Sequence, residues 1–309
     1  MCHSITALEK RQKNRAMKTN KYYLLLGLLA VLPFLQMGCT HIDLEKYPEE
    51  GLVNITFNWS HLSMGDSIPT AMKLCFYGKD SVITRDCKDS VYSGTLPNGN
   101  YQVIAYNTDA TNVGYALATY VDAQAFSQGQ NGVTKAISYL AQPSHSYGIG
   151  LGSLTVFENS VVNETMLPLP FVKKIHLKYA VTGEKQAIAS CSASLSGLAL
   201  SVNIVTGKPV GNTGTVSFIP SSTSDVYEST VTFLGVSNST TNDLGTVLHF
   251  TGGGSQTIKV DITSALIGVN EAVIPIAVKL TIAVTGNVEA GFGATLTGWT
   301  VDTEDVIVE

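Results

Sequence analysis

Charged residues, and the patterns that mark enzymes or nucleic-acid-binding proteins, are scarce in this chain. Charged residues make up 14% of the 309 positions, and the formal net charge is -5 at pH 7. A mildly acidic chain has no basic surface that would attract phosphates, so we expect no nucleic-acid partner. No G-x-S-x-G sequence occurs, and the glycine-rich stretch Thr251 to Ser255 lacks the lysine and hydroxyl residue of a phosphate-binding loop.

Cysteine and histidine are also sparse and scattered. The chain has 5 cysteines and 6 histidines, and no CxxC pair or Cys/His cluster has the spacing of a metal site. The histidines stand in no recognisable catalytic order, and we expect them at surfaces or turns. They include His41, His61, His145, His176 and His249. We therefore expect no metal, no cofactor and no enzymatic activity.

The apolar run near the N-terminus is short. Residues 22–35 form a stretch of 14 uncharged residues, whereas a membrane-spanning helix takes about 20 residues. Pro33 would also break its last turn. Lys18 and Lys21 precede the run and the small residue Gly38 follows it, which is the arrangement of a secretory signal peptide. We therefore expect the run to be removed from the mature protein.

Cleavage directly before Cys39 resembles the processing of bacterial lipoproteins, in which the lipobox cysteine becomes the acylated N-terminus. The resemblance predicts a signal peptide at residues 1–38, lipidation of Cys39 and an anchor in the outer membrane. One position departs from the family pattern, because Gln36 stands where leucine is preferred and Leu35 lies one residue earlier. An ordinary signal peptide that ends near a cysteine is the alternative, and Met17 is a second candidate start.

The rest of the chain shows the period of β-strands. Apolar and polar residues alternate along short runs separated by Gly, Asn, Ser and Pro, which is typical of sheets with one solvated face. The clearest runs are 53–59, 72–77, 175–182, 258–263 and 274–284. No apolar stripe of helical period extends convincingly beyond two turns, and at most a short helix or an irregular loop fits Tyr115 to Gln128. The pattern predicts an all-β chain of antiparallel β-sandwiches.

The length of the chain favours two domains. Removal of the signal peptide leaves 271 residues, and a domain typically has about 100 to 150. Pro168 and Pro170 favour an extended connector before a strong strand that begins at Phe171. The predicted segments are a lipidated tether at residues 39–51, an N-terminal β-sandwich domain at 52–165 and a C-terminal β-sandwich domain at 166–309.

The cysteines beyond Cys39 are odd in number, in a compartment where disulfides form. Cys75 and Cys87 flank a predicted hairpin with its turn near residues 78–80. A disulfide between them across adjacent strands is one option, and an offset register that keeps them apart is the other. Cys191 alternates with apolar residues, so we expect a buried and inert thiol there.

The stretch LPNGNYQVIAYN, Leu96 to Asn107, is predicted to be a turn that leads into a partly buried strand, because Asn98 and Gly99 tolerate a positive φ. Turns of the form L-P-x-G-x-Y recur in transthyretin-like sandwiches. With LQMGC and THIDL around Cys39, and FNW at the end of the first strand, the chain resembles the fimbrillin-like lipoproteins of Bacteroides-type bacteria. The branch it resembles is described as a domain of unknown function. The resemblance implies two transthyretin-like antiparallel β-sandwich domains.

The resemblance also implies assembly by strand exchange. In that assembly a protease removes the first strand after an arginine, and the C-terminal strand of another subunit fills the groove. No arginine lies between Cys39 and Cys75, and Arg85 is inside the predicted hairpin. An anchor or accessory subunit that keeps its first strand, or a relative that does not polymerise, fits this sequence better than a stalk subunit. Trp299 to Glu309 fits the last strand of the second domain, with a donor strand as the alternative.

These observations predict a lipid-anchored structural or adhesion protein of the cell surface, which serves as an anchor or accessory subunit of a fimbria-like assembly. Its partners would be the membrane and other fimbrial subunits. The alternative is a surface lipoprotein that binds glycans, because Trp59, Trp299 and the 13 tyrosines offer stacking platforms for sugars. Most of these aromatic residues fall at alternating strand positions, where packing is the default role.

Overall fold

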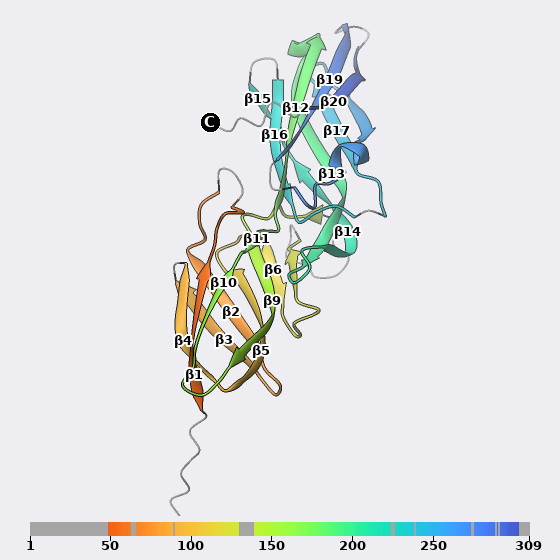
Figure 1. Ribbon diagram of the computed structural model, residues 1–309. Coiled ribbons are helices and arrows are strands. Elements are labelled where there is room, and N and C mark those ends of the chain that lie inside the picture. The colour runs from red at the N-terminus through yellow and green to blue at the C-terminus, as the bar shows by residue number, and fades with distance from the viewer. Residues whose placement is uncertain are drawn as a thin grey trace, which may run out of the picture. The chain divides into compact units, whose positions relative to one another are not determined.

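The computed structural model describes residues 49–62, 66–88, 90–129, 139–223, 226–237, 239–272, 275–287, 289 and 291–302. The prediction of an all-β chain is confirmed, because these residues form the strands β1 to β20 and two short 3-10 helices, η1 (Lys185–Ala187) and η2 (Thr263–Leu266) (Figure 1). Within these ranges there is no helix with the length and apolar character needed to cross a bilayer. The predicted signal peptide and Cys39 lie outside the described residues.

The first sandwich packs a three-stranded sheet against a five-stranded sheet. The strand order is β10-β1-β4 in the small sheet and β11-β9-β5-β2-β3 in the large one. The bounds are β1 Glu50–Phe57, β2 Ala71–Tyr77, β3 Val82–Lys88, β4 Val91–Pro97, β5 Gly99–Asn107, β9 Tyr147–Val156, β10 Val161–Met166 and β11 Leu169–Pro170. The apolar residues of the alternating runs face inward, and Val53, Phe76 and Leu154 are buried in one core between the two sheets.

The second sandwich packs a five-stranded sheet, β15-β16-β12-β19-β20, against a sheet that contains β18-β17-β13-β14-β8. The bounds are β8 Tyr139–Leu140, β12 Lys173–Gly183, β13 Ile188–Asn203, β14 Pro209–Phe218, β15 Ser221–Thr223, β16 Val226–Phe233, β17 Asp243–Phe250, β18 Ser255–Asp261, β19 Ile276–Asn287 and β20 Gly291–Asp302. Leu177, Leu195 and Leu280 are among the residues of its core.

The sheets are mainly antiparallel, as predicted, and they also contain parallel ladders. β1 pairs with β10, β12 with β19 and β14 with β8 in parallel, and the other ladders between the described strands are antiparallel. A parallel ladder joins strands whose connection crosses from one part of a sheet to another, which a period-two pattern does not reveal. The β-sandwich fold is therefore confirmed, with mixed sheets.

The segment from Tyr115 to Gln128 holds strands, so the expected short helix or irregular loop is wrong. β6 (Val113–Ala116) pairs with β7 (Gln124–Ser127), and β7 also pairs with β13. β6 and β7 have only four residues each, which is too short to display a period-two pattern. β13, the second partner of β7, is distant in sequence. β7 precedes the domain boundary predicted near residue 166, yet it extends a sheet of the second sandwich. The position of that boundary stays a prediction.

A junction cluster covers the outer face of β2 and β5. Tyr77 and Ile104 of these strands are buried together with Val113 from β6, Phe171 from the connector and Val202 from β13. The part of the outer face formed by Cys75, Tyr77, Ile104 and Tyr106 is therefore apolar and covered, although the alternating pattern predicts a solvated face. Burial of both faces at these positions of β2 and β5 adds apolar area that stabilises the sheet.

The turn between β4 and β5 lies at Asn98, where the sequence predicts it. The positions with positive φ do not include Asn98 or Gly99, so the expected use of glycine in this turn is wrong. The reason lies in the topology. β4 belongs to the small sheet and β5 to the large one, so the connection crosses between sheets and needs no tight hairpin turn.

Candidate functional site

β1 is the central strand of the small sheet, and both of its edges are paired. It pairs with β10 on one side and with β4 on the other. Its inward side chains Val53, Ile55 and Phe57 are 0%, 0% and 4% exposed. Burying side chains of this size stabilises a fold by about 1.5 to 3 kcal/mol each. The strand that follows the predicted lipid tether is therefore an integral part of the first sandwich.

The outward side of β1 is held by a polar ladder. Asn54 Nδ2 donates to Asn163 Oδ1 of β10 at 2.9 Å. Ser93 Oγ of β4 donates to Asn54 Oδ1 at 2.8 Å. These side-chain bonds cross all three strands of the sheet, so they add to the backbone ladders that keep β1 in place.

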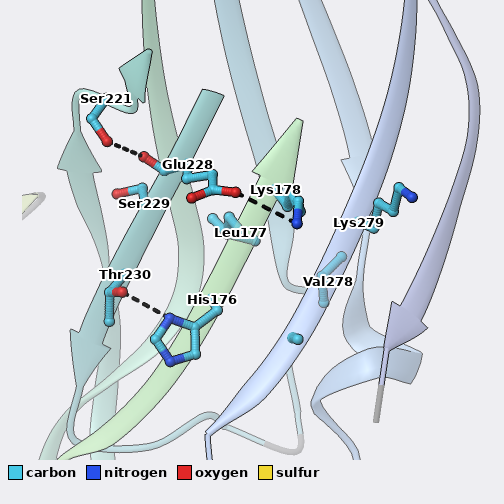
Figure 2. A pocket seen from close by; sticks show the side chains of 10 residues that line it. His176, Leu177, Lys178, Ser221, Glu228, Ser229, Thr230, Val278 and Lys279 are labelled. Carbon is cyan, nitrogen blue, oxygen red and sulfur yellow. Dashed lines mark hydrogen bonds and ion pairs between the residues drawn. The ribbon is translucent and has the colours of Figure 1, made fainter. Parts of the chain in front are cut away.

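The outward face of the five-stranded sheet in the second sandwich contains a polar trough of about 460 Å³. This volume lies within the range of about 300 to 1,000 Å³ that is usual for small-molecule sites. Figure 2 shows its side chains on β12, β15, β16 and β19. The polar trough is lined by His176, Leu177, Lys178, Ser221, Glu228, Ser229, Thr230, Ala277, Val278 and Lys279.

The sheet register explains why these side chains meet. β12 lies between β16 and β19, and Lys178 stands opposite Glu228 on one side and Lys279 on the other. Lys178 Nζ lies 3.6 Å from Glu228 Oε1, and both side chains are about half exposed. In Figure 2 the ammonium of Lys279 extends away from this ion pair. Adjacent like charges repel, which accounts for the separation of the two ammonium groups.

His176 occupies the next row of the polar trough. Its Nδ1 lies 2.8 Å from Thr230 Oγ1, directly across the ladder between β12 and β16. Burial lowers the pKa of His176 below its ordinary value, Lys174 lowers it further, and Glu228 acts in the opposite direction. The imidazole is therefore neutral at neutral pH, and the trough carries two ammonium groups and one carboxylate.

The structure separates Cys75 from Cys87. The register of β2 and β3 places Cys75 opposite Thr84 and Cys87 opposite Met72, so the cysteines project from opposite faces of the sheet. Cys87 Sγ donates to the Val91 carbonyl oxygen at 3.0 Å, and Cys75 is buried as a thiol in the junction cluster. The disulfide that the sequence left open is absent here, and the offset register is the physical reason.

Cys191 lies where the sequence predicts, in the core of the second sandwich. Burial raises the pKa of its thiol to about 11. The histidines are dispersed, and His145 Nε2 approaches Asp109 Oδ1 at 4.0 Å. Among the described residues, no group of three or more His, Cys, Asp and Glu side chains could hold a metal. His176, expected at a surface or turn, lies on the outward face of the strand β12, where it lines the polar trough.

The two tryptophans pack against the sandwich cores, as the default role predicts. Trp59 contacts the core of the first sandwich, its Nε1 donates to Ser90 Oγ at 3.0 Å, and its ring meets that of Tyr147 edge to face. Trp299 packs against the core of the second sandwich from β20. Neither tryptophan lines the polar trough. The last residues of the chain, 303–309, lie outside the described residues.

A family model described as Domain of unknown function (DUF5119) matches residues 38–218, which is more than half of the chain. The match begins one residue before Cys39 and includes the whole first sandwich. No curated protein sequence matches the chain significantly.

Solved structures share the fold at low sequence identity. A candidate adhesin from Bacteroides ovatus ATCC 8483 has a TM-score of 0.60 and 19% identity, with 75% of this chain and 89% of that chain covered. The fimbrial anchor protein Mfa2 from Porphyromonas gingivalis has a TM-score of 0.54 and 10% identity, with 81% and 98% covered. Candidate polysaccharide-binding proteins (DUF1812) from Bacteroides thetaiotaomicron give a TM-score of 0.51 and 10% identity, with 82% and 98% covered.

Proposed function

We propose that this chain, which belongs to the DUF5119 family, is a lipid-anchored structural protein of the cell surface that serves as an anchor or accessory subunit of a fimbria-like assembly. The resemblance to fimbrillin-like proteins that the sequence predicts is confirmed by the family match and by the similar folds of a fimbrial anchor and candidate adhesins. The role in an assembly and the lipid anchor are our proposals.

The position of β1 is the observation that carries the proposal. Glu50, the first residue of β1, follows Cys39 by 11 residues. An extended chain spans at most about 3.3 to 3.6 Å per residue, so a lipid on Cys39 would hold the start of β1 within about 40 Å of the membrane surface. Because β1 is paired on both edges, a pull on the lipid would be shared by two ladders.

The absence of an arginine between Cys39 and β2 supports an anchor role. Arg85, in the middle of β3, is the only arginine after residue 15. An arginine-specific protease would therefore have no site between the lipidated cysteine and the end of β1. A subunit that keeps both its lipid and β1 remains attached to the membrane, as an anchor requires.

Cell fractionation tests the anchor. In the proposal, acylation contributes about 0.8 kcal/mol per buried methylene, and two or more chains anchor a protein stably. Changing Cys39 to Ala should move the chain from the outer-membrane fraction to the soluble fraction. Thr40→Ala is the matched control and should leave it in the membrane. Retention of the Cys39→Ala chain in the membrane would count against lipidation.

Assembly is tested separately by an immunoblot of outer-membrane fractions, loaded with and without boiling. Subunits joined by added strands should give a ladder of detergent-resistant bands that collapses on boiling. A single monomer band in both lanes would reject the assembly and leave an isolated surface lipoprotein.

Saccharide binding is a second candidate function, and the polar trough is the observation that favours it. The trough is open, polar and lined by hydroxyl and charged groups, which suit a ligand rich in hydroxyls. Proteins with a similar fold from Bacteroides thetaiotaomicron are themselves candidate polysaccharide-binding proteins. This function is compatible with a lipid anchor at the cell surface.

A further inference from the structure

The polar trough has an excess of positive charge along one row of the sheet. Glu228, Lys178 and Lys279 are consecutive neighbours across β16, β12 and β19. β20 continues the row with Thr300, which is uncharged. Within the part of the chain that the structure describes, the recorded ion pairs give Lys178 a carboxylate and give Lys279 none. A row with two cations and one anion is complementary to a ligand that carries one negative charge.

The lining of the trough also restricts the chemistry of that ligand. None of the described residues that line the trough is Phe, Tyr or Trp, so a largely apolar ligand would find little complementary surface. Ser221 and Thr230 present hydroxyl groups on β15 and β16. Thr230 and His176 are already paired at 2.8 Å, which leaves the second ring nitrogen of His176 for another partner.

We propose that the polar trough binds a carboxylate-bearing saccharide, such as an oligomer of uronic acids, and this inference rests on saccharide binding, the second candidate function. The sugar carboxylate lies between Lys178 and Lys279 and completes the charge balance of the row. Sugar hydroxyls donate to the Glu228 carboxylate and exchange hydrogen bonds with Thr230 and Ser221. No covalent step is involved.

The present positions of the two lysines fit this arrangement. The ammonium of Lys279 extends away from Lys178 in Figure 2, which reduces the repulsion between two cations on neighbouring strands. A carboxylate placed between them removes that repulsion. Lysine has a flexible stem with rotatable donors, so Lys279 reaches such a carboxylate by a change of rotamer alone.

The test is isothermal titration calorimetry of the purified full chain in detergent with oligogalacturonate. Fully methyl-esterified oligogalacturonate is the ligand control, because it keeps the hydroxyl pattern and lacks the charge. Lys279→Gln should weaken oligogalacturonate binding by about tenfold, which corresponds to the loss of one charge-assisted hydrogen bond. Lys259→Gln, an exposed position on β18 with the same change of charge, should bind as the unchanged chain does.

Several results would overturn the proposal. One is the absence of any heat of binding with oligogalacturonate, and another is equal affinity for its methyl ester. A third is an equal loss of affinity for oligogalacturonate in Lys279→Gln and Lys259→Gln. Binding of phosphatidylglycerol vesicles that depends on Lys279, without binding of oligogalacturonate, would assign the trough to a lipid headgroup and also overturn it. Equal thermal unfolding midpoints of the variants exclude a folding defect. Fractionation of Cys39→Ala reports on the lipid anchor alone. Failure of the anchor proposal is therefore distinguishable from failure of saccharide binding in the polar trough.

Discussion

The side-chain oxygen Oδ1 of Asn107 accepts a hydrogen bond from the backbone N–H of Tyr147 at 2.7 Å. Asn107 is fully buried at the end of β5, and its Nδ2 donates to Asp109 Oδ1 at 2.7 Å and to the carbonyl oxygen of His145 at 3.0 Å. One side-chain amide thus satisfies groups on two segments that are distant in sequence. It fixes the start of β9 against the end of β5 in the first sandwich.

Replacing Asn107 by Ala should destabilise the chain by about 2 to 4 kcal/mol, because it removes three hydrogen bonds and leaves a buried N–H without its acceptor. Asn212→Ala is the matched control at an exposed position of β14, and it should change the free energy of unfolding by less than about 0.5 kcal/mol. Urea denaturation followed by tryptophan fluorescence measures both. Similar small losses in the two variants would contradict the role assigned to Asn107.

Gly183, at the end of β12, is predicted to resist substitution for two reasons. Its φ is +82°, and an added Cβ would lie 2.1 Å from the carbonyl oxygen of Val284 on β19. Gly253 has a similar φ of +88° but no atom within 4 Å of the added Cβ. Gly253→Ala should lower the free energy of unfolding by about 1 kcal/mol through backbone strain. Gly183→Ala should lower it by at least about 1 to 2 kcal/mol more, because the added Cβ also meets the Val284 carbonyl oxygen.

Chemical denaturation of the Gly183 and Gly253 variants separates the two effects. Because the φ values match, the difference between the variants reports the contact with the strand β19. Equal unfolding free energies of Gly183→Ala and Gly253→Ala would mean that β12 and β19 can move apart at Gly183 and Val284 without loss of stability.

The thiol of Cys191 should make stability fall at alkaline pH. Burial raises its pKa from 9.0 to about 11 in the folded chain, so the folded state keeps a proton that the unfolded state loses. Stability is therefore unaffected by this group below about pH 9 and falls as the pH rises toward the folded pKa. Comparing the pH dependence of unfolding in the wild-type chain and in Cys191→Ala isolates the effect, which should amount to roughly 1 to 3 kcal/mol across this window.

Burial is the main cause that raises the pKa values of Tyr179 and Tyr227, and Cys191 raises both further, so the comparison reports the thiol together with its coupling to these two tyrosines. Identical pH dependence with and without the Cys191 thiol would show that the thiol ionises equally in the folded and unfolded states, and would contradict its burial.

Period-two patterns were sufficient to locate the long strands. The run 175–182 lies within β12, and the run 53–59 overlaps β1, because each strand buries one side and exposes the other. β1 ends at Phe57, so the prediction that Trp59 ends the first strand is wrong. The same rule failed for Cys75 and Tyr77, which the alternation places on a solvated face. Both are buried, because the β6 and β7 strands and the connector cover that face with the junction cluster.

The polar trough could be predicted only in part. His176 and Lys178 alternate with buried residues, so the sequence indicates that they share one face of a strand. Their neighbours Glu228 and Lys279 come from β16 and β19, and only the order of strands in the sheet brings them beside β12. Strand order depends on long-range pairing, which local alternation does not encode.

Arg85 provides the last prediction, which concerns whether the folded chain keeps β1. Arg85 lies in the middle of β3 and stands opposite Leu74 of β2. Arg85 is exposed on the edge strand β3, whose one partner among the described strands of the sheet is β2. A protease acts on a locally opened segment, so cleavage at Arg85 needs separation of β3 from β2. An arginine-specific protease should therefore leave the native chain intact and should cut it after denaturation.

Ser60→Arg gives the matched control, because Ser60 is an exposed turn residue three positions after the last residue of β1. The protease should cut this variant quickly, and the β1 fragment should stay bound until boiling, since Ile55 and Phe57 remain buried in the core. Electrophoresis with and without boiling distinguishes the two states. Rapid cleavage of the unchanged native chain at Arg85 would contradict the anchor proposal, because processing would then disrupt the first sandwich that follows the lipid.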